Sequence, residues 1–304
     1  MPDSDRFQLK GYGLILLGSI LFSTKAVMVK MAFRDTPIDA ISLLALRMLF
    51  AFPFFLVTGF FSFRKYKSQL PEKKLWAAMI VMGLLGYYIS SLLDFLGLQY
   101  ITAGLERVIL FLYPSFTILI NAVFFKESIS KKQIIALALC YTGLIVTYFH
   151  EINAGVVMKN ITLGSTLIFL CAITFAGYIA GSGRLLKKVP VMMYTSVALI
   201  ASSVGVFIHY AFTGKFGFQD LHGEMIVYGL MLGIMATVIP NFLVSAGIKS
   251  IGANNAAIVS AVGPVSTIIL AYFFLDEKMS VVQILGTALV IGGVILVCKK
   301  KKSQ

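Results

Sequence analysis

Apolar residues run along the chain in long continuous stretches, which charged or Pro- and Gly-rich segments interrupt at intervals. A helix needs about 20 mostly apolar residues to cross the hydrocarbon core of a bilayer, and the interruptions leave ten stretches of about that length. The strands of a membrane barrel alternate with period two, which these stretches do not. The pattern predicts an all-α membrane protein with ten transmembrane helices, near residues 11–32, 38–62, 74–98, 102–126, 131–149, 162–182, 189–213, 223–247, 252–275 and 280–298.

The charged residues indicate how the chain is oriented in the membrane. Only 13% of the 304 residues are charged and 59% are hydrophobic, too few polar side chains to cover a water-soluble fold. The net charge is +13, but if the predicted spans alternate in direction, most of the 26 Lys and Arg residues fall on the side that holds both termini. The positive-inside rule places that side in the cytoplasm. We therefore expect an integral protein of a bacterial plasma (inner) membrane, surrounded by membrane lipid, with no nucleic-acid partner.

The second half of the chain repeats the first. Residues 97–148 align with residues 247–298 without a gap, and each matched pair differs by 150 positions. Five spans per copy is an odd number, so the second copy enters the membrane from the opposite side, and residues 1–149 and 150–304 are predicted to form two inverted five-helix repeats. Many secondary transporters use such repeats to expose one central site to either side in turn. Identical pairs include Gly83 with Gly233, Pro114 with Pro264, Glu127 with Glu277, and Gly143 with Gly293.

The motifs within this repeat resemble those of a known family. The prolines of the fourth and ninth spans, the turns KES at Lys126–Ser128 and DEK at Asp276–Lys278, and the stretch ALRMLFAFPFF from Ala45 are similar to those of the EamA-like family of the drug/metabolite transporter superfamily. The resemblance covers nearly the whole chain. It implies a helical bundle with a central cavity lined mainly by spans 1, 3, 4, 6, 8 and 9, and export or exchange of small metabolites. Amino acids, drugs, nucleotide precursors and vitamins all occur as substrates, so the resemblance does not choose the cargo.

Several ionisable residues fall inside predicted spans, where each costs about 2.5 to 3.5 kcal/mol at the helix centre. Asp94 and Arg107 lie at equal depth in the hairpin of the third and fourth spans, and we expect an ion pair between them. Glu106 lies near the start of its helix, where the helix dipole favours a carboxylate. Two interpretations stay open. The cluster is a structural bridge, or it is a gate or proton-coupling site in which protonation of Asp94 or Glu106 releases Arg107.

Two further cations belong to the first two spans. Lys25 lies too deep for its ammonium to reach the membrane surface easily, so it needs an anion, either Asp94 or Glu106 or an anionic group of a cargo. Arg47 lies inside the second span. The family resemblance places that span at the periphery of the cavity, so a structural role is favoured for Arg47.

Neutral polar residues form two stripes at helical spacing, one on the third span and one on its counterpart, the eighth. Stripes on repeat-related helices are expected to meet across the pseudo-symmetry axis, where a binding site belongs. For a single Ser, Thr or Asn, hydrogen bonding between helices is the simpler interpretation. The predicted substrate-binding residues are Lys25, Tyr87, Ser91, Tyr113, Tyr178, Thr237, Asn241 and Asn255, and the predicted gate or proton-coupling residues are Asp94, Glu106 and Arg107.

The remaining motifs argue against catalysis. The chain has no P-loop and no HExxH sequence, and its three histidines lack metal-ligand spacing, so we expect no cofactor, metal or catalytic residue. The sequence thus predicts a secondary transporter, an exporter or exchanger, that moves a small polar or amphiphilic solute by alternating access. An amino acid or related organic acid is the expected cargo, since Lys25 and Arg107 face the path. The alternatives are an integral-membrane enzyme on a lipid-linked substrate, with Glu106 or Asp94 as base, and a channel.

Overall fold

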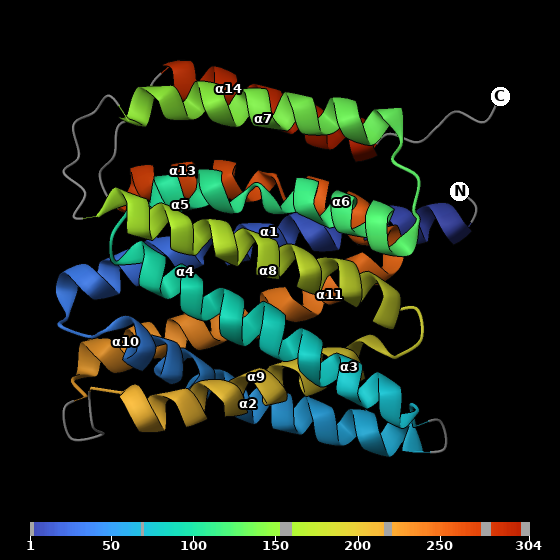
Figure 1. The fold of residues 1–304 in the computed structure, drawn as a ribbon, viewed down its shortest axis with the longest axis vertical. Helices are drawn as coiled ribbons and strands as arrows, with labels where there is room; N and C mark the ends of the chain where they lie inside the picture. The colour runs from blue at the N-terminus through green and yellow to red at the C-terminus, as the bar shows by residue number, and fades with distance from the viewer. Residues whose placement is uncertain (1–2, 68–69, 153–159, 216–220, 275–280, 299–304) are drawn as a thin grey trace.

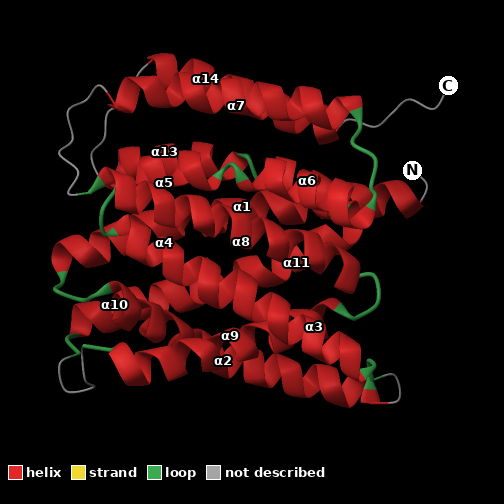
Figure 2. Ribbon diagram, in the orientation of Figure 1, coloured by secondary structure: helices red, strands yellow, loops and turns green. Residues whose placement is uncertain are grey.

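The computed structural model describes residues 3–67, 70–152, 160–215, 221–274 and 281–298. The DEK turn at Asp276–Lys278 lies outside these residues. Within the described ranges all regular structure is helical, and short loops join the helices (Figure 2). The helices lie side by side along roughly one common direction (Figure 1). The predicted all-α class is therefore confirmed.

The helices follow the apolar stretches of the sequence. In chain order they are α1 (Asp3–Asp35), α2 (Ala40–Lys65), α3 (Lys73–Gly83), η2 (Leu84–Ile89), α4 (Ser90–Leu98), α5 (Ala103–Leu110), α6 (Tyr113–Phe125), α7 (Lys131–Ile152), α8 (Ile161–Leu185), α9 (Val191–Thr213), α10 (Gly223–Gly233), η4 (Ile234–Val238), α11 (Ile239–Ile251), α12 (Ala253–Val259), α13 (Val262–Phe274) and α14 (Val281–Cys298).

In the described residues, six helical stretches are long and apolar enough to cross a membrane by length and composition. They coincide with predicted spans one to three and six to eight. Predicted spans four and nine are each divided into two shorter helices, α5 with α6 and α12 with α13. The ten-span count therefore stays a prediction. The six stretches are Gln8–Asp35, Ala40–Lys65, Lys73–Leu98, Ile161–Leu185, Val191–Thr213 and Gly223–Ile251.

The surface of the bundle differs from that of a water-soluble protein. Large apolar side chains project outward, among them Phe212 at 85% and Phe124 at 75% exposed. Arg47, Asp94 and Glu106 are buried, each at 1% exposure or less. In a bilayer the apolar exterior contacts lipid, and polar groups find their partners inside the bundle. This arrangement, together with the long apolar helices, is that of an integral membrane protein.

Short polar residues fix where some of the helices begin. The Asp39 carboxylate accepts hydrogen bonds from the backbone N–H groups of Ile41 and Ser42 and caps α2. Thr102 caps α5 through the N–H of Leu105 at 3.1 Å. These bonds satisfy N–H groups that have no partner within the helix itself. The cap at Thr102 also sets the register that places Glu106 in the first turn of α5.

Two of the long helices contain a segment of π-helix, η2 between α3 and α4 and η4 between α10 and α11. At each, a hydroxyl donates to the carbonyl five residues earlier, Ser90 to Leu85 at 2.8 Å and Thr237 to Leu232 at 2.7 Å. A π segment inserts an extra residue into a turn and occurs often at functional sites. Both segments fall on the polar stripes of the sequence.

Prolines accompany the division of two other helices. Helix α5 ends at Leu110 and α6 begins at Tyr113, with Pro114 in its first turn. Helix α12 ends at Val259 and α13 begins at Val262, with Pro264 in its first turn. Proline lacks the N–H that would continue a helix through the break, but it suits a first turn.

Helices from the two halves of the chain pack together in pairs. Helix α7 packs against α14, α1 against α11, and α2 against α9. Glycines allow some close approaches, since a Cβ atom at Gly83 would lie 2.1 Å from the carbonyl oxygen of Ala198, and one at Gly233 would lie 2.9 Å from that of Arg47. Small residues at helix contacts are the usual means of close packing in membranes. Helix α1 begins and α14 ends at the same side of the bundle (Figure 1).

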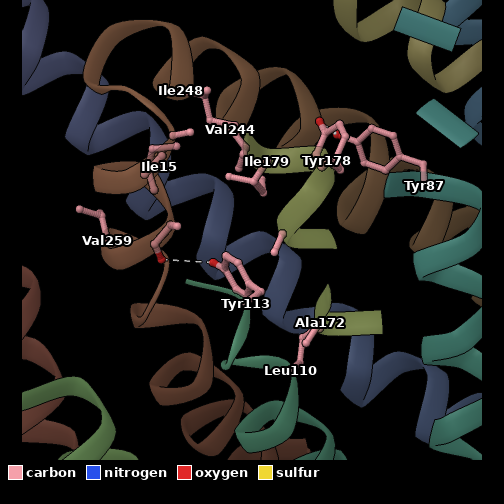
Figure 3. Packing of buried hydrophobic residues seen from close by; sticks show 14 of the residues in the cluster. Ile15, Tyr87, Leu110, Tyr113, Ala172, Tyr178, Ile179, Val244, Ile248 and Val259 are labelled. Carbon is pink, nitrogen blue, oxygen red and sulfur yellow. Dashed lines mark hydrogen bonds between the residues drawn. The ribbon is translucent and has the colours of Figure 1, made fainter. Parts of the chain in front are cut away.

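The centre of the bundle is apolar and aromatic. Figure 3 shows Tyr87 of η2 beside Tyr178 of α8, with Ile179 and Val244 near them. The hydroxyl of Tyr113 in α6 crosses to α12, where it donates to the carbonyl oxygen of Ala257 at 3.3 Å. Each tyrosine thus packs its ring among apolar side chains and satisfies its hydroxyl.

Candidate functional site

A cavity of about 100 Å³ lies between the helices, walled by residues of α1, α2, η2, α4, α5, α6, α8, α11 and α13. Three cations line it, Lys25, Arg47 and Arg107, and no carboxylate is among the lining residues. Much of the remaining wall is apolar, including Phe22 and Phe175. The cavity wall therefore combines positively charged and apolar side chains.

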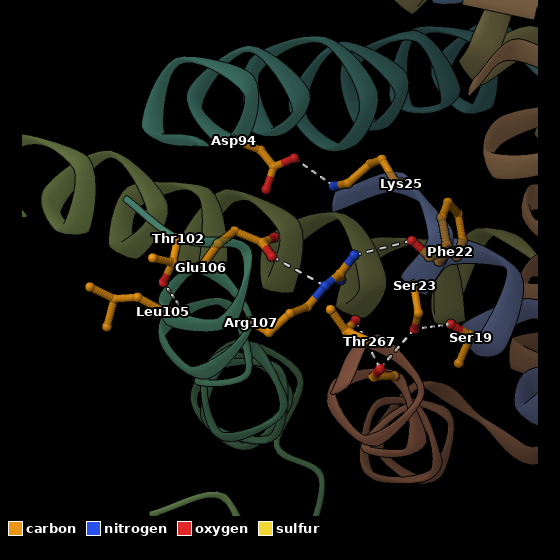
Figure 4. A network of polar contacts seen from close by, with 11 residues as sticks. Ser19, Phe22, Ser23, Lys25, Asp94, Thr102, Leu105, Glu106, Arg107 and Thr267 are labelled. Carbon is orange, nitrogen blue, oxygen red and sulfur yellow. Dashed lines mark hydrogen bonds and ion pairs between the residues drawn. The ribbon is translucent and has the colours of Figure 1, made fainter. Parts of the chain in front are cut away.

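Two ion pairs lie beside this cavity (Figure 4). Lys25 Nζ of α1 lies 2.6 Å from Asp94 Oδ2 of α4, and Arg107 Nε lies 3.1 Å from Glu106 Oε2 within α5. Arg107 also donates through Nη2 to the carbonyl oxygen of Phe22 in α1, at 3.1 Å. The two pairs join α1, α4 and α5, and each cation in them has its own carboxylate.

The predicted ion pair between Asp94 and Arg107 is wrong. Asp94 pairs with Lys25, because α1 packs next to α4. Arg107 pairs with the residue that precedes it in the chain, Glu106. The hairpin argument considered only two helices and could not include a third one that supplies a cation at the same depth. Of the partners proposed for Lys25, Asp94 is the one observed.

Arg47 has a different environment. Its side chain is 1% exposed and lines the cavity, although the sequence analysis placed it at the periphery. Nε donates to Thr237 Oγ1 at 2.6 Å and Nη1 donates to Ser91 Oγ at 3.2 Å. The guanidinium carbon lies 5.6 Å from the ring centre of Phe95. Arg47 thus joins the two polar stripes, one residue from each, through neutral groups.

The predicted tyrosines lie on or beside the cavity. Tyr87 and Tyr113 line it. Tyr178 lies behind Tyr87, with the two hydroxyls hydrogen-bonded and the ring centres 4.7 Å apart. Ser182, one turn further along α8, bonds the hydroxyl of Tyr194. Ser182 also donates to the backbone carbonyl oxygen of Tyr178 at 2.6 Å, so polar contacts link the tyrosine pair beside the cavity to Tyr194 of α9.

The residues of the eighth-span stripe lie mostly behind the wall. Thr237 contacts the cavity through Arg47. Asn241 is fully buried and donates to the Thr237 carbonyl oxygen at 2.7 Å. Its Oδ1 has no hydrogen-bond partner among the described residues. Thr237 and Asn241 thus support Arg47, and direct contact with a solute stays a prediction for both.

Asn255 lies elsewhere, in a polar group of side chains where α6 and α8 end and α12 begins. Its Oδ1 accepts from Gln133 Nε2 at 3.2 Å. Next to it, Asn121 Nδ2 donates to Asn254 Oδ1 at 2.6 Å, and Arg184 Nη2 lies 2.9 Å from Glu127 Oε1. These contacts link the first half of the chain to the second, outside the central cavity.

Sequence reasoning missed the part that Arg47 plays in the cavity wall. It identified Arg47 as one of the cations within predicted spans but assigned its helix to the rim. A usable signal was present, because the spans of the first half hold more cations than carboxylates, so at least one cation lacks an acidic partner. Within the described ranges, no group of three His, Cys, Asp or Glu side chains is placed to hold a metal ion.

The long apolar helices and the buried ion pairs are those of a helical membrane protein, and comparison with known proteins shows its family. The profile of the EamA-like transporter family matches residues 9–149 and again residues 162–299. The chain belongs to the EamA-like transporter family. The predicted family is therefore confirmed. Because this is a family of transporters, it does not support the alternative of an integral-membrane enzyme.

Individual relatives agree with this assignment. The chain is 29% identical to YcbK, an uncharacterized transporter of Bacillus subtilis (strain 168), over 93% of this chain and 89% of the relative. It is 26% identical to sll1319, an uncharacterized transporter of Synechocystis sp., over 97% and 95% of the two chains. A solved crystal structure superposes with a TM-score of 0.71 at 17% identity, covering 96% of this chain and 95% of its own. The last likeness shows a shared fold.

Proposed function

We propose that this protein is a secondary transporter that carries a small polar or amphiphilic solute with an anionic group, an amino acid or related organic acid, across the bacterial plasma membrane. Export or exchange by alternating access is the proposed mode, with both termini in the cytoplasm. The observation that carries the proposal is the cavity within the bundle, walled by Lys25, Arg47 and Arg107 with no carboxylate among its lining residues. Ionisable residues at membrane depth mark solute and ion paths in membrane proteins.

The proposed architecture is two inverted five-helix repeats, residues 1–149 and 150–304. Positions 150 apart support it, because η2 begins at Leu84 and η4 at Ile234. Cys140 Sγ lies 3.8 Å from the carbonyl oxygen of Val290, its own counterpart. In a two-fold related pair of helices, residues on the axis contact their own counterparts. The packing of α1 on α11 also has an equivalent, that of α8 on α4.

Alternating access would explain why the cavity is small and why polar contacts join the two halves of the chain beside it. The cavity holds about 100 Å³, whereas pockets that enclose drug-sized ligands measure roughly 300–1,000 Å³. A solute that needs more space than this requires the helices to move apart. The contacts of Asn121 with Asn254 and of Glu127 with Arg184 join the two halves at one side of the cavity. In this scheme they open when the solute path opens to that side.

The charged cluster is proposed as a gate or proton-coupling site. Asp94 and Glu106 have neighbouring carboxyl groups, and each faces a cation that also lines the cavity. A proton that neutralises either carboxyl weakens its ion pair. Release of Lys25 or Arg107 would then couple the proton to solute binding or to the opening of the path.

The test is solute exchange in proteoliposomes. Purified protein is reconstituted into vesicles loaded with amino acids, organic acids, nucleosides, sugars or amines, and uptake of the same labelled solute from outside is measured. We expect exchange of one anionic or zwitterionic class, above that of protein-free vesicles. Ion currents without exchange of any solute would instead identify a channel and overturn the proposal.

A paired variant tests the place of Lys25 in the path. Lys25→Ala is expected to reduce exchange, because it frees the Asp94 carboxylate beside the cavity. Lys10→Ala removes a lysine near the start of the same helix, at an exposed position, and is expected to leave exchange unchanged. Equal exchange by both variants would show that neither Lys25 nor the charge of Asp94, which it neutralises, affects the solute path.

A further inference from the structure

Arg47 differs from the other cations of the cavity in having no acidic partner. Lys25 and Arg107 each pair with a carboxylate. Among the described residues no carboxylate forms an ion pair with Arg47, whose two hydrogen bonds go to the hydroxyls of Thr237 and Ser91. Around the cavity there are thus three cations and two carboxylates, and the unmatched positive charge is on Arg47.

A buried cation without an anion is costly, and its hydroxyl partners do not neutralise it. A buried charge in a protein is ordinarily paired, since removing it from water costs several kcal/mol. Arg47 is 1% exposed, so bulk water does not solvate its charge. Asp94 is close enough to act on Arg47 electrostatically, but its carboxylate forms its ion pair with Lys25. Among the described residues, Arg47 therefore has a position on the cavity wall and no carboxylate in direct contact.

The guanidinium of Arg47 has donors left for a ligand. A guanidinium carries five N–H groups in a planar fork that matches a carboxylate, and the bonds to Thr237 and Ser91 use two of them. Those bonds and the ring of Phe95 also fix the orientation of the side chain. Such a held guanidinium loses little freedom when it binds an anion.

We infer that Arg47 binds the carboxylate of the transported solute and that the apolar wall of the cavity receives the rest of it. This inference rests on the proposed transport function and deepens it. A single unmatched cation suits a group of one negative charge, and Phe22, Phe111 and Phe175 on the same wall suit an apolar body. Lys25, already neutralised by Asp94, is not the principal anion-binding residue.

The test compares matched acids and amides on purified protein. Phenylacetate and isovalerate carry the carboxylate, and phenylacetamide and isovaleramide are their uncharged counterparts of nearly the same shape. Binding is measured as the shift of the thermal unfolding midpoint in detergent against probe concentration. We expect the acids to stabilise the wild type and the amides to bind at least about tenfold more weakly, the loss of one charge-assisted contact. Equal binding of acid and amide, or no binding of any acid, would overturn the inference.

Variants of Arg47 then assign the contact. Arg47→Gln keeps hydrogen bonds but removes the charge, and we expect acid affinity to fall about 30-fold or more while amide affinity changes little. Arg47→Lys keeps the charge but lacks the planar fork of the guanidinium. Its affinity for the acids should lie between that of the wild type and that of Arg47→Gln. Arg34→Gln removes an exposed arginine outside the cavity, paired with Asp35, and serves as the control.

The outcomes separate this inference from the proposed function. Arg47→Gln protein that binds acid as tightly as the wild type makes Arg47 a structural residue, while exchange in proteoliposomes stands. If Arg47→Gln does not fold, Arg47→Lys and the acid-to-amide ratio of the wild type decide. Tighter binding of phenyl phosphate than of phenylacetate would also overturn the assignment to a carboxylate. Absence of exchange of any solute in vesicles, with acid binding intact, would overturn the transport function alone.

Discussion

The two proposed repeats share glycines, π segments and helix packing, but they differ in charge. The ionised side chains around the cavity come from the first half, and each has an apolar residue 150 positions later. The second half forms the same kind of helices without them, so the fold does not require these charges. Charges retained at membrane depth, where they are costly, point to function. The pairs are Lys25 and Phe175, Arg47 and Val197, Asp94 and Val244, Glu106 and Ala256, and Arg107 and Ala257.

The largest effect is expected from breaking the charge balance of the first half. Asp94→Asn leaves the ammonium of Lys25, whose side chain is only 13% exposed, without its carboxylate. Loss of one partner of a buried pair costs about 3–5 kcal/mol. We therefore expect a marked fall in the thermal unfolding midpoint of the purified protein in detergent.

A double variant provides the control for this effect. Lys25→Met combined with Asp94→Leu removes both charges and makes this point of the first half as apolar as the second. It should recover most of the lost stability, because replacing a buried ion pair by apolar residues is often close to neutral. Equal loss in the single and double variants would mean that packing, and not charge, explains the effect of Asp94→Asn.

A smaller effect is expected where the two halves are alike. Gly83→Ala and Gly233→Ala each place a Cβ atom against the backbone of a neighbouring helix, at 2.1 and 2.9 Å. Overpacking of this kind costs about 1–3 kcal/mol, and Gly83→Ala should cost more because its contact is closer. Gly292→Ala, which meets nothing within 4 Å, is the control. Unchanged unfolding midpoints for both variants would contradict the close packing.

The smallest effect on stability is expected at the π segments. Ser90→Ala and Thr237→Val each remove a hydroxyl that makes two hydrogen bonds, and such bonds are worth about 0.6 kcal/mol each in a membrane protein. The two variants should nevertheless differ in ligand binding, because Thr237 also holds Arg47 and Ser90 does not. Phenylacetate affinity should fall severalfold in Thr237→Val alone. The same affinity in both variants would show that Thr237 does not orient Arg47.

Much of the fold could be predicted because its signals are local or periodic. Apolar length predicted the spans, and six of them are long apolar helices at the expected places. The sequence also correctly predicted that Glu106 lies near the start of its helix. The breaks between α5 and α6 and between α12 and α13 fall just before Pro114 and Pro264. Apolar length alone does not predict them, because the apolar stretch continues through each break.

The site was less accessible to sequence reasoning. Helical spacing correctly brought Tyr87 and Ser91 to one cavity wall. The predicted ion pair between Asp94 and Arg107 was wrong. The partner of a charged residue depends on all the helices that surround a hairpin and not on the hairpin alone. For the same reason the sequence did not show that Arg47 lines the cavity, since its hydrogen-bond partner Thr237 is 190 positions away along the chain.

The positive wall of the cavity also determines what the path excludes. Two unit charges of like sign 4 Å apart repel by about 4 kcal/mol at an effective dielectric constant of 20, which disfavours occupancy roughly a thousandfold. A sodium or potassium ion entering the cavity meets such repulsion at Arg47, with no carboxylate among the lining residues to offset it. If this cavity is the path of an anionic solute, as proposed, the same positive charge also opposes a leak of metal cations through the empty transporter.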